Sequence, residues 1–173
     1  MTGYGYNILG FGTVIEAGVT PSPYALHALG NVNTAINNVE RITVASTGNA
    51  TDFGDLDSAL YAFCTSASDN TRYVVSGGIV GIVDTIQYFT YASTGNSTDF
   101  GNLSAASKQG SNGQIGNTTR GVIHLGANSS NTILNTLEHI TIQSTGNSTD
   151  FGDLTVTKRL GAASGNSTRG IFF

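Results

Sequence analysis

The sequence predicts an all-β protein built from a repeated unit. Three observations predict it. A distinctive block occurs three times in fixed order. Short runs of β-branched and aromatic residues alternate with clusters of Gly, Asn and Ser, which form turns. The strands of one unit follow each other so closely that no crossover helix fits between them.

The repeat is defined by three markers that recur at nearly constant spacing. One is a strand-like run at 37–45, 84–92 and 135–143, directly before the central marker. The central marker reads STGNATDFGDL at 46–56, STGNSTDFGNL at 93–103 and STGNSTDFGDL at 144–154. A Thr-Arg marker follows each block, and its residues Thr71, Thr119 and Thr168 are 48 and 49 residues apart. Self-similarity at such a fixed period indicates a repeat architecture.

These markers divide the chain into units of about 49 residues. The Thr-Arg marker has diverged at the start of the first unit, but YALHALG at 24–30 aligns with RGVIHLG at 120–126. Residues 169–173 open a fourth unit with a single strand. Residues 1–23 are expected to form an N-terminal docking arm, extended at Pro21 and Pro23. The repeat domain covers 24–173, with units 24–71, 72–119 and 120–168.

Each unit predicts about four short strands in meander order. The first is a β-branched run that ends at Gly. The second, NTLEHITIQ at 135–143, alternates between two faces and predicts a half-buried strand. STGN then supplies a turn, because Gly adopts positive φ and Asn tolerates it. TDFGDL predicts a short strand or bend with one buried aromatic ring, and a weaker strand with a loop completes the unit.

Four strands in roughly fifty residues suit one blade of a kelch-like propeller. Propellers close with roughly four to eight blades, so three units are too few for one chain. Two chains would together provide about six blades, or the chain would dock into a larger complex. The alternative is a single-chain β-prism or β-trefoil with pseudo-threefold symmetry.

Composition excludes several classes of protein. Only 10% of residues are charged and the net charge is −4, so a nucleic-acid partner is not expected. No apolar run approaches the length of a membrane span, and no charged n-region precedes an apolar stretch at residue 1. The lone Cys64 is expected to be a small buried apolar residue. No cofactor is predicted.

Acidic residues flank Phe-Gly in each unit and form the candidate metal sites. Carboxylates three residues apart, close to turn carbonyls, have the chemistry that Ca²⁺ prefers. The favoured interpretation is structural, with these side chains accepting backbone N–H bonds in a bend. In the second unit Asn102 replaces one acid. The carboxylates are Asp52, Asp55, Asp99, Asp150 and Asp153.

No arrangement of residues predicts catalysis. His27, His124 and His139 lack the partner spacing of a metal or nucleophile site, so packing or surface roles are expected. The DFG triplets lack the Gly-rich loop, Lys and HRD loop of a protein kinase. An active site is normally unique, whereas every distinctive motif here is triplicated. The chain is therefore predicted not to be an enzyme.

The Arg that follows Thr in each Thr-Arg marker and the Phe of each DFG triplet are predicted to join neighbouring units. The arginines are expected to pair with aspartates of TDFGD; a ring of Arg holding an anion is the alternative. The phenylalanines supply the buried aromatic ring of each DFG. These inter-unit residues are Arg72, Arg120, Arg169, Phe53, Phe100 and Phe151.

The STGNATDFGDL blocks, with strands such as ERITVA before them and STRGIFF after them, resemble a known repeat family. These are the kelch-like repeat proteins encoded by marine bacteriophages, particularly those of cyanobacteria. The resemblance covers 24–173. It implies a virion structural protein, in a tail or on a capsid, without catalytic residues. It also implies assembly in the host cytoplasm and localisation to the virion.

The predicted function is therefore a non-enzymatic virion component that forms a homo-oligomer and contacts other virion proteins. The alternative is a lectin-like binder of host cell-surface glycans with one shallow site per unit. Equal sites would need aromatic side chains at equivalent positions for stacking on sugar rings. Tyr61, Tyr73 and Tyr91 do not recur in register, which favours the structural role.

Overall fold

A computed structural model describes residues 22–31, 35–57, 65–78 and 81–173 of the chain. Every helix or strand assigned in this part of the chain is a strand, which confirms the all-β prediction. Within the same residues there is no helix with the length and apolar character needed to span a membrane.

The strands fall into the units that the repeat predicts. The first unit contains β1 (Tyr24–Asn31), β2 (Ala35–Thr43), β3 (Thr51–Asp55) and β4 (Thr65–Ser68). The second contains β5 (Arg72–Ser76), β6 (Thr85–Thr90), β7 (Thr98–Asn102), β8 (Ser107–Lys108) and β9 (Asn112–Gln114). The third contains β10 (Arg120–His124), β11 (Ala127–Asn128), β12 (Thr136–Thr141), β13 (Thr149–Asp153) and β14 (Ala162–Gly165). The last strand is β15 (Gly170–Phe172).

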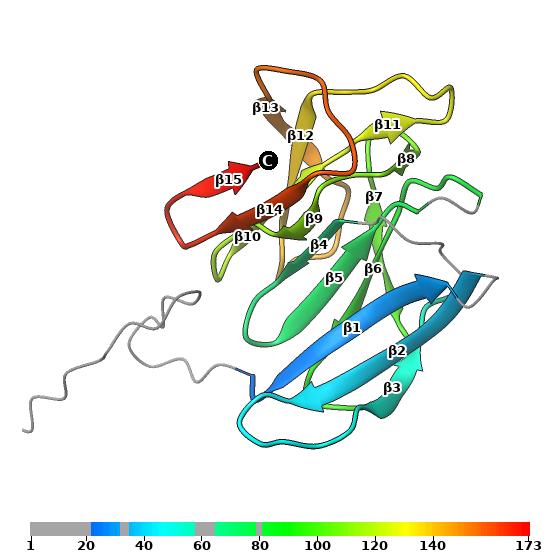
Figure 1. The fold of residues 1–173 in the computed structure, drawn as a ribbon, viewed down its shortest axis with the longest axis vertical. Coiled ribbons are helices and arrows are strands. Elements are labelled where there is room, and N and C mark those ends of the chain that lie inside the picture. Colours follow the sequence, from blue (N-terminus) through cyan, green and yellow to red (C-terminus); the bar gives the residue numbers. More distant parts are fainter. Residues whose placement is uncertain (1–21, 32–34, 58–64, 79–80) are drawn as a thin grey trace, which may run out of the picture.

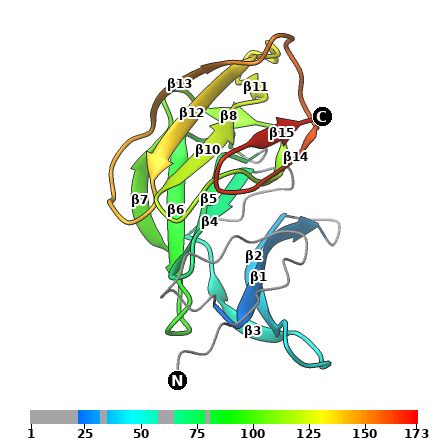
Figure 2. The same ribbon diagram turned by 90° about the vertical axis from the view of Figure 1, so that its left-hand side faces the viewer.

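The same antiparallel meander occurs in each unit. It consists of β1-β2-β3, then β5-β6-β7, then β10-β12-β13. The three meanders follow one another along the long axis of the molecule (Figures 1 and 2). Each has a β-bulge at the DFG triplet, because the residues flanking Phe pair with consecutive residues of the middle strand. A bulge leaves one extra residue unpaired and bends its strand.

The last strand of each unit connects the units to each other. β9 pairs in parallel with β4 on one side and with β14 on the other. These strands lie inside a seven-stranded sheet with the order β15-β14-β9-β4-β5-β6-β7. Parallel pairing between units was not predicted, because the predicted meander included only contacts within one unit.

Hydrophobic clusters of the described residues lie between successive meanders, and a further cluster packs β10 and β12 against β14 and β15. Val75 and Phe89 of the second unit pack toward Phe53 of the first. Val74 and Phe100, from the second unit, pack instead toward the third unit, in a cluster that also contains Ile140. Adjacent residues of β5 thus serve different clusters, as alternation across a strand requires. The meander of the second unit is covered on both faces.

On β12 the face with Glu138 and Ile140 is buried, whereas Thr141 on the other face is exposed, as the prediction of a half-buried strand expects. Gln87 on β6 and Glu138 on β12 are the polar residues of this buried face, and each is only 2% exposed. The neighbouring unit packs over them. The alternating pattern places Glu138 on the same face as Ile140, but it carries no information about the unit that covers this face.

Both ends of the stack of meanders expose apolar side chains among the described residues, although β14 and β15 cover part of the third unit. At the first unit, Ile42 is 47% and Val44 is 68% exposed, whereas their counterparts Ile140 and Ile142 are buried. At the other end, Phe151 is 47% exposed, although Phe53 and Phe100 are buried. The prediction of a buried DFG ring is therefore confirmed for two units and wrong for the third, where no described unit covers it.

Candidate functional site

The recurrent motif forms the junction between units. The backbone N–H of Gly95, in the second STGN turn, donates to the carbonyl of Phe53 at 2.8 Å, and Ser97 donates to Asp55 at 2.8 Å. At the next junction Gly146 donates to Phe100 at 2.7 Å and Ser148 donates to Asn102 at 3.0 Å. Each STGN turn therefore binds the outer edge of the preceding DFG strand.

An asparagine side chain completes each junction. Asn96 Oδ1 accepts the backbone N–H of Asp55 at 3.1 Å, and Asn147 Oδ1 accepts that of Asn102 at 3.0 Å. The amide oxygen occupies the place that a backbone carbonyl would take in a regular parallel ladder. Each such bond contributes about 0.5–1.5 kcal/mol net, and an unpaired buried N–H would cost more.

Glycine is required at the junction because the two backbones touch. Gly54 has φ of +150°, and a Cβ on it would collide with the carbonyl oxygen of Gly95. Gly101 has φ of +146°, and a Cβ there would collide with the carbonyl oxygen of Gly146. At Gly152, with φ of +124°, a Cβ would meet nothing within 4 Å. The third DFG also has a positive φ at its glycine, but no turn of the described residues packs on it.

At each junction a buried polar side chain forms hydrogen bonds to both units. Gln87 Oε1 accepts the N–H of Asp57 in the preceding unit at 2.9 Å and the hydroxyl of Ser97 at 2.6 Å. Glu138 accepts hydrogen bonds from Ser104 in the preceding unit and from the hydroxyl of Ser148. These partners satisfy groups that would otherwise be costly to bury.

Arg72 contacts the next unit, but not through an aspartate. Its Nη1 donates to the carbonyl of Ile142 at 3.0 Å, and its guanidinium lies 4.4 Å from the ring centroid of Tyr88. The first unit has the same cation–ring contact with the two residue types on opposite strands. There the Arg41 guanidinium on β2 lies 4.7 Å from the ring centroid of Tyr24 on β1. The expected partner was wrong because a carbonyl of the next unit lies within reach.

The contacts of each DFG ring depend on whether a following unit packs against it. The ring of Phe53 meets Phe89 of the next unit edge-on at 5.9 Å. Phe100 meets Tyr88 of its own unit at 6.0 Å and shares a cluster with Ile140 of the next. Phe151 meets only His139 in this way, at 6.0 Å.

The candidate calcium residues lie on the surface beside the junctions. Asp52 accepts a hydrogen bond from Asn38 at 2.9 Å, and Asp150 accepts one from the backbone of Gly152 at 3.3 Å. The described residues contain no group of three or more His, Cys, Asp or Glu side chains placed to hold a metal ion. The calcium site stays a prediction, and the contacts observed are those of turn and strand residues.

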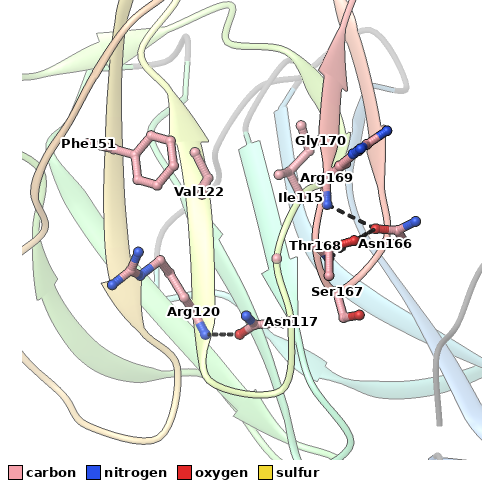
Figure 3. Close-up of a pocket in the computed structure, with 11 residues that line it drawn as sticks. Ile115, Asn117, Arg120, Val122, Phe151, Asn166, Ser167, Thr168, Arg169 and Gly170 are labelled. Atoms are coloured by element: carbon pink, nitrogen blue, oxygen red, sulfur yellow. Dashed lines mark hydrogen bonds between the residues drawn. The ribbon is translucent and has the colours of Figure 1, made fainter. Parts of the chain in front are cut away.

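A groove of about 180 Å³ lies at the open end of the stack, beside β13 and β15 (Figure 3). Two equivalent hairpin turns border it. Asn117 Oδ1 caps one turn by accepting the N–H of Arg120 at 2.8 Å, and Asn166 Oδ1 caps the other by accepting that of Arg169 at 2.9 Å. The two guanidinium groups point away from each other (Figure 3), so they do not converge on one anion.

His124 is the one histidine that the fold buries completely. Its Nε2 faces the carbonyl of Leu134 at 3.4 Å and therefore donates, while Nδ1 accepts from the hydroxyl of Ser111 at 2.8 Å. Burial lowers the pKa of the His124 imidazole below its ordinary value, and the positive charge of Lys158 lowers the pKa further. His139 is half-buried and His27 is exposed, as packing or surface roles predict.

Some sequence predictions fall outside the described residues. They concern Cys64, Tyr61 and residues 1–21, which include most of the predicted docking arm.

Sequence reasoning assigned the Asn and Ser of STGNS only to turn formation and so missed the residues that join the units. It also missed Gln87 and Glu138. One signal was present. Asn and Ser recur at the same two positions of the second and third blocks, although a turn alone would accept several other residue types there.

Comparison of the chain with protein-family models and with curated proteins finds no match.

We predict that alanine has different effects at equivalent glycines. Gly95→Ala and Gly152→Ala cost about 1–3 kcal/mol of stability, because only backbone strain opposes them. Gly101→Ala costs at least about 1–3 kcal/mol more, because its Cβ also collides with the next turn. Urea unfolding of the three variants measures the difference. Equal destabilisation of all three would show that the turn does not contact the strand.

We predict that acid destabilises the fold through His124. Its pKa is lower when folded, so the unfolded chain binds the proton first. The stability is present above the unfolded pKa of about 6.5 and is lost as pH falls below it. The expected loss approaches about 1.4 kcal/mol per pH unit for one proton. Urea unfolding between pH 7 and pH 5 measures this slope, and His124→Asn should flatten it. An unchanged slope in that variant would contradict the assignment.

Proposed function

We propose that this chain is a non-enzymatic structural protein of a bacteriophage virion, a capsid decoration or tail component that acts through protein–protein contacts. One observation carries the proposal: apolar side chains are exposed at both ends of the stack, including Val44 at 68%, Ile171 at 65% and Phe173 at 67%. Exposed apolar surface of this kind marks interaction sites. The resemblance of the STGN–DFG blocks to phage repeat proteins supplies the virion context.

The work done by the recurrent residues supports a structural role. Gly, Asn and Ser of the STGNS turn, Phe and Gly of DFG, and Arg72 all make contacts between units. Catalysis would need residues free to converge on a substrate. The repeated residues of this chain instead join one unit to the next.

The arrangement of the units favours an open stack over a closed ring. Direct parallel pairing of β4, β9 and β14 connects the units in a row. A propeller instead arranges its sheets around a central channel. We therefore favour the open stack over the propeller-like closure and over the β-prism or β-trefoil. Further copies or other virion proteins extend the stack at its ends, during assembly in the host cytoplasm.

A second candidate function is binding of cell-surface glycans. The groove beside β13 favours it, because the exposed ring of Phe151 offers a stacking surface beside the polar side chains of Asn117, Arg120 and Asn166. The expected result is glycan-array binding that Phe151→Ala abolishes. Absence of binding on the array would reject this candidate.

The virion proposal is tested on particles of the phage that encodes the chain. Mass spectrometry of gradient-purified virions should detect the protein in the particle band, and a high-salt wash should leave it there, because apolar contacts are not screened by salt. Detection only in the soluble fraction of the lysate would contradict the proposal. The glycan array is independent of this measurement.

A further inference from the structure

The two junctions inside the chain define what the DFG end of a unit binds. In both cases the occupant is an extended strand followed by an STGNS turn, supplied by the next unit. β6 and its turn cover the first unit, and β12 and its turn cover the second. The contacts are the same: two backbone bonds, one Asn amide, one buried Gln or Glu, and an apolar side chain over the DFG ring.

The third unit presents the same groups without an occupant among the described residues. β13 is the last strand of its sheet, so the edge away from β12 carries no described strand. Nothing lies within 4 Å of a Cβ at Gly152, and Phe151 is half exposed. The guanidinium of Arg120, the equivalent of Arg72, makes no hydrogen bond to a described residue.

A strand edge is also available beside this face. In the second and third units the first strand pairs with the middle strand of its own meander, β5 with β6 and β10 with β12. β15 occupies the equivalent place and pairs with β14 on one edge only. An unpaired strand edge accepts another strand by backbone hydrogen bonding.

We propose that the face formed by β13, β15 and Arg120 binds an extended strand followed by a Thr-Gly-Asn-Ser turn, supplied by another molecule that carries the same repeat. The strand pairs with the free edge of β15, and the turn binds the free edge of β13. This inference rests on the proposed function, because it names the partner chemistry of one of the contact surfaces.

The chemistry of each position fits this occupant. The turn amides reach the carbonyls of Phe151 and Asp153, and the Asn side chain accepts the N–H of Asp153, as at the internal junctions. A Glu or Gln on the strand meets Thr155, the counterpart of Ser104. A backbone carbonyl at the strand end meets Arg120.

A folded second copy of this chain fits less well. Its own middle strand in the first unit, β2, is already paired with β1 along seven residue pairs. On the face, that β1 would take the place of β15. A free strand and turn requires no such exchange, so we assign the face to a segment whose strand is unpaired before binding.

The test uses a synthetic peptide with the sequence of residues 135–149, NTLEHITIQSTGNST, labelled for fluorescence anisotropy and titrated with the full 173-residue chain. Saturable one-to-one binding is expected. A peptide with Ile140→Asp should bind at least about tenfold more weakly, because that side chain faces the ring of Phe151.

Two protein variants locate the site. Gly152→Ala should weaken peptide binding at least about tenfold, because its Cβ meets the carbonyl of the incoming turn. Gly95→Ala is the matched control: its φ of +152° carries similar strain, but a Cβ there meets nothing within 4 Å. It should bind the peptide as the unmodified chain does. Thermal unfolding confirms that both variants are folded.

Three results would overturn the proposal. They are no binding, equal binding by Gly152→Ala, and self-association of the chain that Gly152→Ala abolishes while the peptide does not bind. The third result would assign the face to a second copy. The titration is independent of whether the protein is found in virions, so its failure is distinguishable from failure of the proposed function.

Discussion

The contact between an STGN turn and the DFG strand before it is the constraint on which the rest of the structure depends. It is a contact between two backbones, so it requires Gly54 and Gly101 at its centre. It brings the next middle strand over the DFG ring, and this places Phe89 on Phe53. Burial of one such aromatic ring contributes about 1.5–3 kcal/mol. The apolar and the polar contacts at the junction make free-energy contributions of similar size. Both require the turn and the DFG strand to lie in direct contact.

This contact also explains the low charge of the chain. Units that pack face to face bury polar side chains inside the junctions, as Gln87 shows. Uncharged Ser, Thr and Asn satisfy backbone groups there at a lower desolvation cost than ions would. The abundance of these residues reflects unit-to-unit packing as well as turn formation.

The sequence predicted the all-β class and the turns because these depend on local pattern. Asn166 capping the last Thr-Arg turn is an example, since its bonds reach only Thr168 and Arg169. The parallel pairing of β9 with β4 and β14, the partner of Arg72 and the burial of Glu138 depend on the neighbouring unit. Alternation within one strand cannot reveal such contacts. The exposure of Phe151 has the same origin, because its sequence context matches that of the buried Phe100.

Amide hydrogen exchange followed by NMR tests the central contact most directly. The account predicts strong protection at Gly95 and Gly146, whose N–H groups bind the preceding DFG strand, and fast exchange at Gly48, whose turn contacts no described unit. Fast exchange at all three glycines would show that the turns are not bound to the preceding DFG strands.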